Sequence, residues 1–447
     1  MVETSEIIKK SKRDALRVLW QAIESVNPEN AVNRSFRLKY ENLHVDEKIV
    51  NLANFRKIHV IGAGKASTQM AKAVENILMK RLSGGLVCTK KGHAVPLHYA
   101  NVMEANHPVP DNTSLLAGQR TLKYVQGCDK GDLIICLISG GASAMWSVPV
   151  PGITFEDKQK TTDALLKCGA NIHEINTIRK HISAIKGGKL LQAATPATVI
   201  TLAISDVVGD EMSSIGSGPT VGDPTTFQQA FNILEKYKLG PKLPTSVLDY
   251  IWHGYKKKNK ETPKPSDQIF SNNPTSIISS NSHALNTAME TARHLGYKTY
   301  IFSSQLTGEA SIVGPKLVEK IKQMAGSKRP NDPPIMMLSG GETTVTMTGN
   351  GKGGRNQELV LSTAIAMEGA DNLLAASIGT DGIDGNTDAA GAFADGTTVL
   401  RGREAGLEAN DFLAGNNSYE YFNRLGDLIK TGPTGTNVMD IQVLIIG

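Results

Sequence analysis

Apolar runs that end in or near glycine recur along the chain, and stretches with helical spacing separate them. Four such runs lie in the first half: KIHVIGAG from residue 57, GGLVCTKKG from residue 84, DLIICLISGG from residue 132 and ATVITLAISDVVGD from residue 197. Runs of this kind are typical of buried strands that lead into loops. Residues 67–82 and 113–127, which lie between them, have helical periodicity. This order predicts an α/β protein with a mostly parallel, doubly wound sheet.

The alternation returns in the second half, after a segment that interrupts it. Residues 255–274 hold a lysine cluster, three prolines and polar residues. Five apolar runs follow: TSIISSN from residue 275, KTYIFSS from 298, PIMMLSGGETT from 334, NLLAASIGTDGIDG from 372 and IQVLIIG from 441. We therefore expect two α/β domains, residues 1–254 and a smaller one over 275–447, with 255–274 as the boundary or an exposed excursion. An amphipathic helix over residues 5–25 opens the first domain.

Composition and charge narrow the classes of protein that fit. The chain has 447 residues, of which 40% are hydrophobic and 20% charged, as in globular proteins. Its net charge of +5 is modest and no dense basic run is interleaved with aromatics, so nucleic-acid binding is not indicated, whereas small anionic substrates are compatible. The cysteines form no C-x-x-C pair, so we expect free thiols and neither a zinc site nor disulfides. A polar N-terminus and the lack of a long apolar run predict a cytoplasmic protein.

The loop VIGAGKAS invites a dinucleotide interpretation, which its details weaken. Ser67 stands where G-x-G-x-x-G has its last glycine, and the next strand ends in lysine rather than in the acid that binds a ribose. The loop also lacks the five-residue arc of a phosphate-cradling G-x-x-x-x-G-K-[ST] motif. Lys65 follows Gly64 and has two interpretations. It is either a solvated loop charge or, because the dipole at the start of a helix repels a cation, a group whose charge a bound carboxylate or phosphate neutralises.

Three further glycine-rich loops are candidates for binding phosphate or carboxylate, because glycine lets backbone amides approach a ligand closely. Each could also be a simple tight turn. The segment GNGKGGRNQE (349–358) adds a cation, Arg355, whose planar guanidinium suits a transferring phosphoryl group. The candidate binding residues in the four loops are Gly62, Gly64, Ser139, Gly140, Gly141, Ser143, Ser339, Gly340, Gly341, Glu342, Lys352, Gly354 and Asn356.

Aspartates follow two of the predicted strands. Asp206 and Asp210 stand in ISDVVGDE, and Asp381, Asp384 and Asp388 in GTDGIDGNTD. Strand-end carboxylates beside phosphate loops suit Mg²⁺, which takes one or two carboxylates plus phosphate oxygens. Asp206 and Asp381, nearest their strands, are the favoured metal ligands, and good turn formation is the alternative for all five.

Two more segments carry possible ligand-binding side chains. His107, in ANHPVPDN, is by default part of a rigid turn, with contact to a substrate as the alternative. Residues 171–191 are expected to be helical, and the odd step KGGK within them favours a role in binding for Arg179 or Lys189 as much as simple solvation.

Taken together, the blocks VIGAGKAS, ANHPVPD, LISGGASA, NTIRKHISAIKGGKL, ISDVVGDEMSSIGSGPT, LSGGETTVTMTGNGKGGRNQE and SIGTDGIDGNTDAAGAF resemble, in this order, the type II glycerate kinases, a MOFRL-containing family of glycerate 2-kinases. The resemblance runs from about residue 5 to the end. It implies a Rossmann-like N-terminal domain, a smaller α/β domain and an active site in the cleft between them. It also implies transfer of the γ-phosphoryl of ATP to the C2 hydroxyl of D-glycerate with a divalent cation. Lys65 and Arg355 match the principal catalytic residues of the family.

Our hypothesis places the phosphates on the Ser139–Ser143 turn and on the GNGKGGR loop, and Mg²⁺ on Asp206 or Asp381. Asp206 is also the candidate acceptor of the hydroxyl proton. An NAD(P)H-dependent hydroxypyruvate reductase is the alternative enzyme, and a non-catalytic binder of sugar acids or nucleotides is the alternative class. D-Glycerate and ATP are the expected partners, without nucleic acid or membrane. A homodimer is a further expectation, which does not come from a residue pattern.

Overall fold

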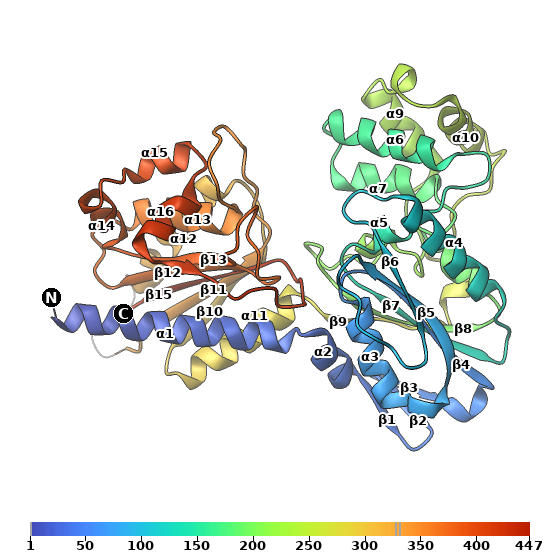
Figure 1. The fold of residues 1–447 in the computed structure, drawn as a ribbon, viewed down its shortest axis with the longest axis horizontal. Helices are drawn as coiled ribbons and strands as arrows, with labels where there is room; N and C mark the ends of the chain where they lie inside the picture. The colour runs from blue at the N-terminus through green and yellow to red at the C-terminus, as the bar shows by residue number, and fades with distance from the viewer. Residues whose placement is uncertain (1, 327–328, 330–331) are drawn as a thin grey trace. The chain divides into compact units, whose positions relative to one another are not determined.

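The computed structural model describes residues 2–326, 329 and 332–447. The chain forms two compact units. The central unit is residues 31–278, and the terminal unit combines residues 1–30 with residues 279–447 (Figure 1). This division differs from the predicted 1–254 and 275–447 at both ends of the first domain, for the reasons given below. No helix in the described part of the chain is long and apolar enough to cross a membrane.

The central unit is built on a six-stranded sheet with the order β6-β5-β4-β7-β8-β9. Its strands are β4 (Lys57–Ala63), β5 (Leu82–Lys90), β6 (Asn101–Ala105), β7 (Asp132–Ile138), β8 (Thr198–Ile204) and β9 (Thr275–Ser279). The pairs β4–β5, β4–β7, β5–β6 and β7–β8 are all parallel. Counted from β4, this is the order 3-2-1-4-5-6 of doubly wound nucleotide-binding sheets. The predicted Rossmann-like α/β architecture is confirmed.

Helices cover both faces of this sheet. Helix α3 (Ser67–Leu78) packs on β4 and β5, while α4 (Asn112–Gln126), α5 (Ala142–Met145) and α8 (Lys189–Ala194) share one core with the sheet. Figure 1 also shows a separate helical cluster. It consists of α6 (Phe155–Lys167), α7 (Ile172–His181), α9 (Phe227–Lys236) and α10 (Thr245–Tyr255), which bury their own core around Leu165, Ile178 and Val247. A small antiparallel sheet, β1 (Phe36–Lys39), β2 (Asn42–Val45) and β3 (Lys48–Asn51), precedes β4.

Two predictions about this region are wrong. Residues 171–191 are not one helix, because Gly187 and Gly188 adopt positive φ of 59° and 79° and separate α7 from α8. The run at 275–281 does not open the second domain, because β9 lies beside β8 in the central sheet. Residues 255–274 therefore return the chain to this sheet and pack within the central unit, where Thr262 donates to Asp223.

The terminal unit holds a mixed sheet with the order β10-β11-β15-β12-β13-β14. Its strands are β10 (Lys298–Leu306), β11 (Ile335–Gly341), β12 (Leu373–Gly379), β13 (Gly391–Asp395), β14 (Leu428–Ile429) and β15 (Asp440–Ile446). Only β10 and β11 pair in parallel, and β15 is antiparallel to both of its neighbours. Its helices are α1 (Val2–Ser25), α11 (Asn281–His294), α12 (Ala310–Ala325), α13 (Arg355–Ala366), α14 (Thr398–Glu404), α15 (Ala409–Ala414) and α16 (Ser418–Leu425), while α2 (Pro28–Ser35) crosses between the units.

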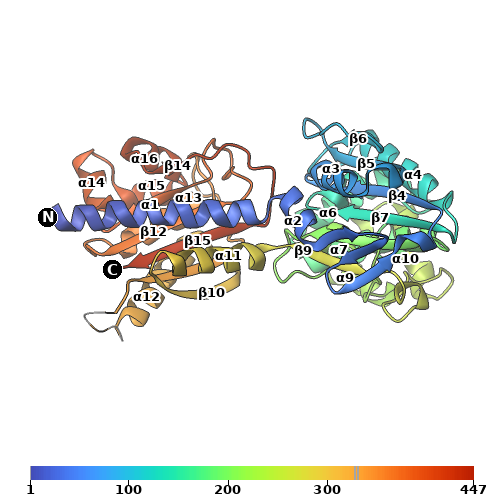
Figure 2. The same ribbon diagram turned by 90° about the horizontal axis from the view of Figure 1, so that it is seen from below.

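The opening helix belongs to this second sheet. Helix α1 lies along α11 in both views (Figures 1 and 2) and contacts β12 and β15. Its Asp14 carboxylate accepts a hydrogen bond of 2.8 Å from the hydroxyl of Tyr297. The helix was correctly predicted as amphipathic, but it packs against α11, β12 and β15, which belong to the last part of the chain. Sequence proximity had placed it in the first domain.

Candidate active site

The loops after β4 and β7 meet at the point where the strand order of the central sheet reverses. The Lys65 N–H donates to the carbonyl of Gly140 at 2.9 Å, and the Ala66 N–H donates to Ser139 Oγ at 3.1 Å. Gly64 has φ of +132°, and a Cβ there would collide with Ser139. In open α/β sheets this reversal is where ligands bind. Predicted residues Gly64, Lys65, Ser139 and Gly140 are thus brought together, with Gly62 just before them inside β4.

Asp206 joins these loops from the end of β8. A Cβ on Gly140 would collide with the Asp206 carboxylate, so the glycine is what lets the acid lie against the loop. Burial raises the pKa of Asp206, and the positive charge of Lys65 opposes that rise. Neither hydrogen bonds nor ion pairs to the described residues occupy the Lys65 ammonium. The arrangement leaves a cation and a carboxylate side by side at the switch point, free to act on a ligand.

His107 reaches the same place from the loop after β6. Its ring Cδ2 would lie 2.9 Å from a Cβ on Gly141. Burial, together with nearby Lys65, Lys90 and His93, lowers the pKa of His107 to about 4. The imidazole is therefore neutral near pH 7 and can exchange a hydrogen bond with a ligand, the alternative that the sequence left open for it.

Ser143 continues the β7 loop into a polar network. Lys186 Nζ donates to the carbonyl and to the hydroxyl of Ser143 at 2.6 and 2.9 Å. Ser143 Oγ lies 2.9 Å from Ser217 Oγ, which in turn donates to Asn176 at 3.3 Å. Arg179 lies one helical turn beyond Asn176 on α7. Lys186, the first residue of the odd KGGK step, is buried inside this network.

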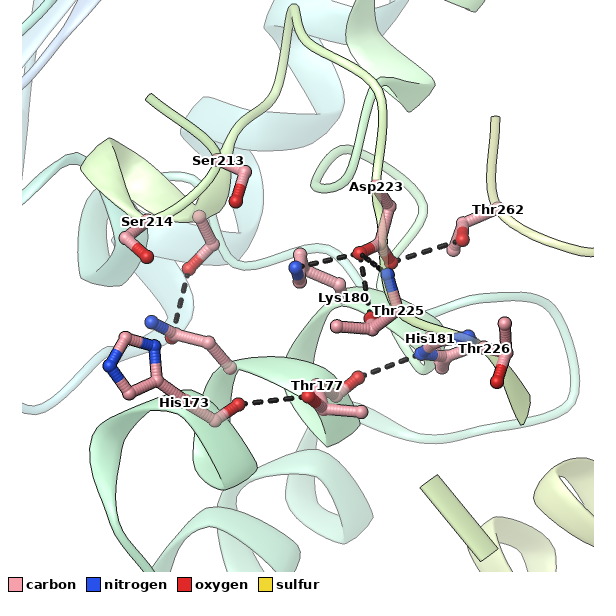
Figure 3. A network of polar contacts seen from close by, with 12 residues as sticks. His173, Thr177, Lys180, His181, Ser213, Ser214, Asp223, Thr225, Thr226 and Thr262 are labelled. Atoms are coloured by element: carbon pink, nitrogen blue, oxygen red, sulfur yellow. Dashed lines mark hydrogen bonds and ion pairs between the residues drawn. The ribbon is translucent and has the colours of Figure 1, made fainter. Parts of the chain in front are cut away.

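The other cations of this region support the fold. Figure 3 shows Lys180 paired with Asp223 at 2.7 Å, with Thr225 and Thr262 also bound to that carboxylate. Lys189 Nζ donates to the carbonyls of Lys180 and His181 at 3.0 and 3.2 Å and to that of Ser183. Because these carbonyls use the donors of Lys189, its ammonium ties the end of α7 to α8. This geometry gives no support to the expected binding role of Lys189.

In the terminal unit, Arg355 begins α13 and is held by two acids. Its Nε and Nη2 donate to the two carboxylate oxygens of Asp440 at 2.6 and 2.8 Å, and its Nη1 lies 2.9 Å from Glu342. Burial acts against the charged guanidinium, but Asp440 and Glu342 outweigh it and raise the pKa of Arg355. Asp440 itself is fully buried. The bidentate pair fixes the plane of the guanidinium, and about a third of the Arg355 side chain remains exposed to solvent.

A cavity of about 440 Å³ lies beside this arginine, lined by Glu342, Thr343, Val345, Gly354, Arg355 and Glu358. Lys352 is exposed on the same loop, with its ammonium 4.1 Å from the centre of the Tyr419 ring. Predicted residues Glu342, Gly354 and Arg355 therefore line one concave surface. Lys352 lies on the adjoining glycine-rich loop, and Arg355 is the cation of this surface beside Glu342 and Glu358.

The Ser339-Gly340-Gly341 step does not form the predicted anion nest. All three residues belong to β11, which is paired with β10 on one side and β15 on the other, so their amides serve the sheet. Ser339 Oγ is fully buried and donates to Gln442, and a Cβ on Gly340 would collide with Asn281. The similar sequence Ser139-Gly140-Gly141 begins after the last residue of β7, so it can form a turn, whereas Ser339-Gly340-Gly341 is part of a strand.

Asn356 and Asp384 also have structural positions. Asp384 accepts hydrogen bonds from the backbone N–H groups of Asn356 and Gln357 at 3.1 and 2.8 Å, so it occupies the N-terminus of α13. Burial raises the pKa of Asp384 to about 6, and those amides oppose the rise. Asn356 is buried and accepts from Ser377, which removes it from the ligand surface. Asp388 lies apart, bound to Tyr419 and Lys430.

Acidic groups outnumber cations around Arg355. Asp381, on the loop after β12, lies close enough to Asp440 to act on its pKa, which burial raises and Arg355 lowers. Asp440, Glu342 and Asp384 all act on the Arg355 guanidinium, and Asp381 adds a fourth carboxylate beside Asp440. An excess of oxygen ligands with negative charge is the donor set that Mg²⁺ prefers. Asp381, only partly buried, is the member best placed to reach a ligand.

A further grouping of metal-binding side chain types was not predicted. Atoms of His59, Cys128 and Asp132 lie within 4.8 Å of one another. They stand near the opposite, N-terminal ends of β4 and β7, and His59 also contacts the Tyr124 hydroxyl at 2.9 Å. The sequence spacing concealed this cluster, because its members come from three separate elements. All four cysteines are free thiols.

The strand order and the glycine loops at its reversal define a Rossmann-like α/β protein with a ligand site at the switch point. Two family models match the chain: the domain of unknown function DUF4147 over residues 14–252 and the MOFRL family over residues 335–440. The chain is 42% identical over 432 residues to a glycerate 2-kinase of Pyrococcus horikoshii, covering 96% of each, and 38% identical to a D-glycerate 2-kinase of Thermotoga maritima, covering 97% of this chain and 98% of that one.

A putative hydroxypyruvate reductase of Agrobacterium vitis is also 42% identical, over 390 residues and 87% of each chain. Among solved structures, glycerate kinase from Thermotoga maritima superposes with a TM-score of 0.87 at 36% identity, covering 98% of this chain and 100% of that one. The chain belongs to the glycerate kinase family.

Proposed function

We propose that this protein transfers the γ-phosphoryl group of ATP to the C2 hydroxyl of D-glycerate, giving 2-phospho-D-glycerate and ADP. The observation that carries the proposal is Lys65 beside Asp206 at the switch point of the central sheet, in a chain whose near full-length relatives are glycerate 2-kinases. Phosphoryl transfer asks little covalent chemistry of a protein, so positioning and charge stabilisation carry the catalysis.

In the central unit, Asp206 accepts the proton of the attacking hydroxyl. Burial raises the pKa of Asp206 against the effect of Lys65, which is the direction that makes a carboxylate a better base. Lys65 neutralises charge on the phosphoryl group in transfer, and the amides of the Ser139–Ser143 turn hold phosphate oxygens. The neutral ring of His107 contributes a hydrogen bond to the same ligand.

In the terminal unit, Arg355 offsets charge on the γ-phosphoryl from a plane that Asp440 fixes. The glycine-rich loop with Lys352 holds the nucleotide phosphates. When bound, Mg²⁺ would neutralise negative charge on the phosphate groups. Asp381 is its preferred ligand here, because it stands in an excess of carboxylates, whereas Asp206 is balanced by Lys65.

A coupled assay tests the reaction. With D-glycerate, ATP and Mg²⁺, we expect enolase alone to convert the product to phosphoenolpyruvate. A requirement for phosphoglycerate mutase as well would show that the 3-phosphate forms. Lys65→Ala and Arg355→Ala should each lower kcat by roughly 10³-fold or more, as the loss of an arginine finger does. An Arg355→Ala enzyme with normal turnover would reject the assignment of that residue.

Hydroxypyruvate reduction is the competing activity, since the name of one relative carries it. The first loop argues against a nicotinamide cofactor. Ser67, in the place of the last glycine of the motif, is buried, and its hydroxyl donates to the carbonyls of Gly64 and Cys88 at 2.8 and 2.7 Å. Strand β5 ends in Thr89 and Lys90, without an acid for the ribose. Incubation with hydroxypyruvate and NADH should leave the nicotinamide absorbance unchanged.

A further inference from the structure

Three cationic side chains of the central unit lie close enough to affect one another electrostatically, and no carboxylate among the described residues forms an ion pair with them. They are Lys158 on α6, Arg179 on α7 and Lys186 in the turn after α7. Lys158 and Lys186 are only 4% and 2% exposed. Their hydrogen-bond acceptors are neutral: Lys158 donates to the Ser147 hydroxyl at 2.9 Å, and Lys186 to Ser143. We call this group the cationic cluster.

Arg179 is the member of the cluster that lacks a partner. The hydrogen bonds from Ser143 through Ser217 to Asn176 bring one face of α7 against the β7 loop. Residues three apart on a helix share a face, so Arg179 faces the same region as Asn176. In the described part of the chain, no hydrogen bond or ion pair engages its guanidinium, although the side chain is largely removed from water.

The electrostatics of the cluster are unfavourable without a ligand. Burial lowers the pKa of all three groups, and the lysines are lowered further by their cationic neighbours. No carboxylate raises the pKa of any of them, whereas the adjacent Lys180 has Asp223. Buried charges are normally paired. An anion is the partner that would stabilise the charged forms of these groups.

We propose that the cationic cluster, with Arg179 as the contact residue, binds the carboxylate of the three-carbon acid that this enzyme phosphorylates. The planar guanidinium matches a carboxylate in a bidentate arrangement. Of the three side chains, only that of Arg179 is partly exposed to solvent, so the cluster can accept a small anionic group such as a carboxylate but not a bulky ligand. Ser143 connects the cluster to the loop that faces Lys65 and Asp206, which places the hydroxyl of such an acid toward those groups. The identity of the acid rests on the proposed function.

Calorimetric titration of the enzyme without nucleotide tests this site directly. D-Glycerate, glycerol and ADP are titrated into the wild type, Arg179→Gln, Arg179→Lys and Arg120→Gln. Arg120 is an exposed cation on α4 of the same unit and serves as the matched control. We expect Arg179→Gln to bind D-glycerate about 10- to 100-fold more weakly, the loss typical of a charged hydrogen-bonded contact. Arg179→Lys should fall between, and ADP binding should not change.

The outcomes separate this proposal from the others. If Arg179→Gln binds ADP more weakly and D-glycerate normally, the cluster binds the nucleotide and the proposal is wrong. The proposal is also wrong if glycerol, which has no carboxylate, binds to the wild type as tightly as D-glycerate. A fall in Tm of Arg179→Gln with normal D-glycerate affinity would make Arg179 a structural residue. We expect the Tm to stay equal or rise, since one of three repelling charges is removed. If D-glycerate binding depends on Arg179 but the enzyme does not phosphorylate the acid, the proposed kinase activity is wrong and the carboxylate site is supported. If Arg179→Gln has normal turnover and a normal KM for D-glycerate, the carboxylate site is wrong and the kinase activity is supported.

Discussion

The buried carboxylate of Asp440 offers a way to disturb Arg355 without touching it. In Asp440→Asn the side chain keeps its size and one acceptor oxygen, but it loses its charge and one of the two hydrogen bonds, of 2.6 and 2.8 Å, that hold the guanidinium. The plane of Arg355 is then no longer fixed from two sides. Asp440 is fully buried and its carboxylate is bound to Arg355, so we expect its effect on turnover to pass mainly through the arginine, with a smaller electrostatic effect on Asp381.

The structure sets the expected sizes. A hydrogen bond between charged groups contributes about 1.5–3 kcal/mol, and the partly exposed guanidinium recovers some hydration, so the free energy of unfolding should fall by about 2 kcal/mol. A misplacement of about 1 Å in a catalytic group costs up to roughly 10²-fold, so kcat should fall about 10- to 100-fold. The KM for D-glycerate should change little, because the acid is bound in the other unit in our proposal.

Urea denaturation and the enolase-coupled assay measure both effects. Asp427→Asn is the matched control, since Asp427 is a buried acid of the same unit, paired with Arg401 at 2.6 Å and Lys12 at 2.9 Å, and belongs to no ligand loop. It should lose a similar stability with kcat within about twofold of the wild type. Normal turnover in Asp440→Asn, or an equal loss of kcat in both variants, would refute the role of Asp440 in orienting Arg355.

Three other predictions follow from the geometry. Burial lowers the pKa of Lys158 to about 7. Between about pH 7 and 10.5 the unfolded chain therefore binds more protons than the folded one, and the free energy of unfolding rises with pH. In urea denaturation, Lys158→Met should stabilise the protein by about 2–3 kcal/mol more at pH 6 than at pH 9. Gly140→Ala should push the Asp206 carboxylate away and lower kcat about 10- to 100-fold with little change in Tm. Gly341→Ala should mainly lower the free energy of unfolding, by about 2 kcal/mol or more in calorimetry. Gly341 has φ of +139°, and a Cβ there would collide with the backbone of Leu306.

The strands that carry the central site could be predicted, because each is an apolar run closed by the loop it positions. KIHVIGA, DLIICLI and TVITLAI became β4, β7 and β8 with little adjustment. Lys65 and Asp206 follow directly from that pattern, since the carboxyl ends of parallel strands meet at one edge of a sheet. Local periodicity was sufficient there because each of these strands is complete within one apolar run and the parallel order of a doubly wound sheet brings their loops to one edge.

The terminal site shows where such reasoning stops. Ser339 and Ser139 stand in almost the same letters, but β11 has a partner strand on each side of its last residues and β7 does not extend into its glycines. Asp440 lies 85 positions from Arg355, and its only signal was a single acid before the final apolar run. Pairings of this range depend on the antiparallel course of β15, which no spacing in the sequence reveals.

The interleaving of the two units has a consequence for biosynthesis. Residues 31–278 leave the ribosome as one continuous stretch that holds every strand of their sheet except the last residue of β9, so this unit can fold while the rest is still being made. The other unit has to wait. Its first helix emerges at the start, yet β15, which fills the middle of its sheet between β11 and β12, is translated after every other strand of that sheet. Until then α1 has no completed surface to cover, and a nascent chain at that stage is a natural client for chaperones.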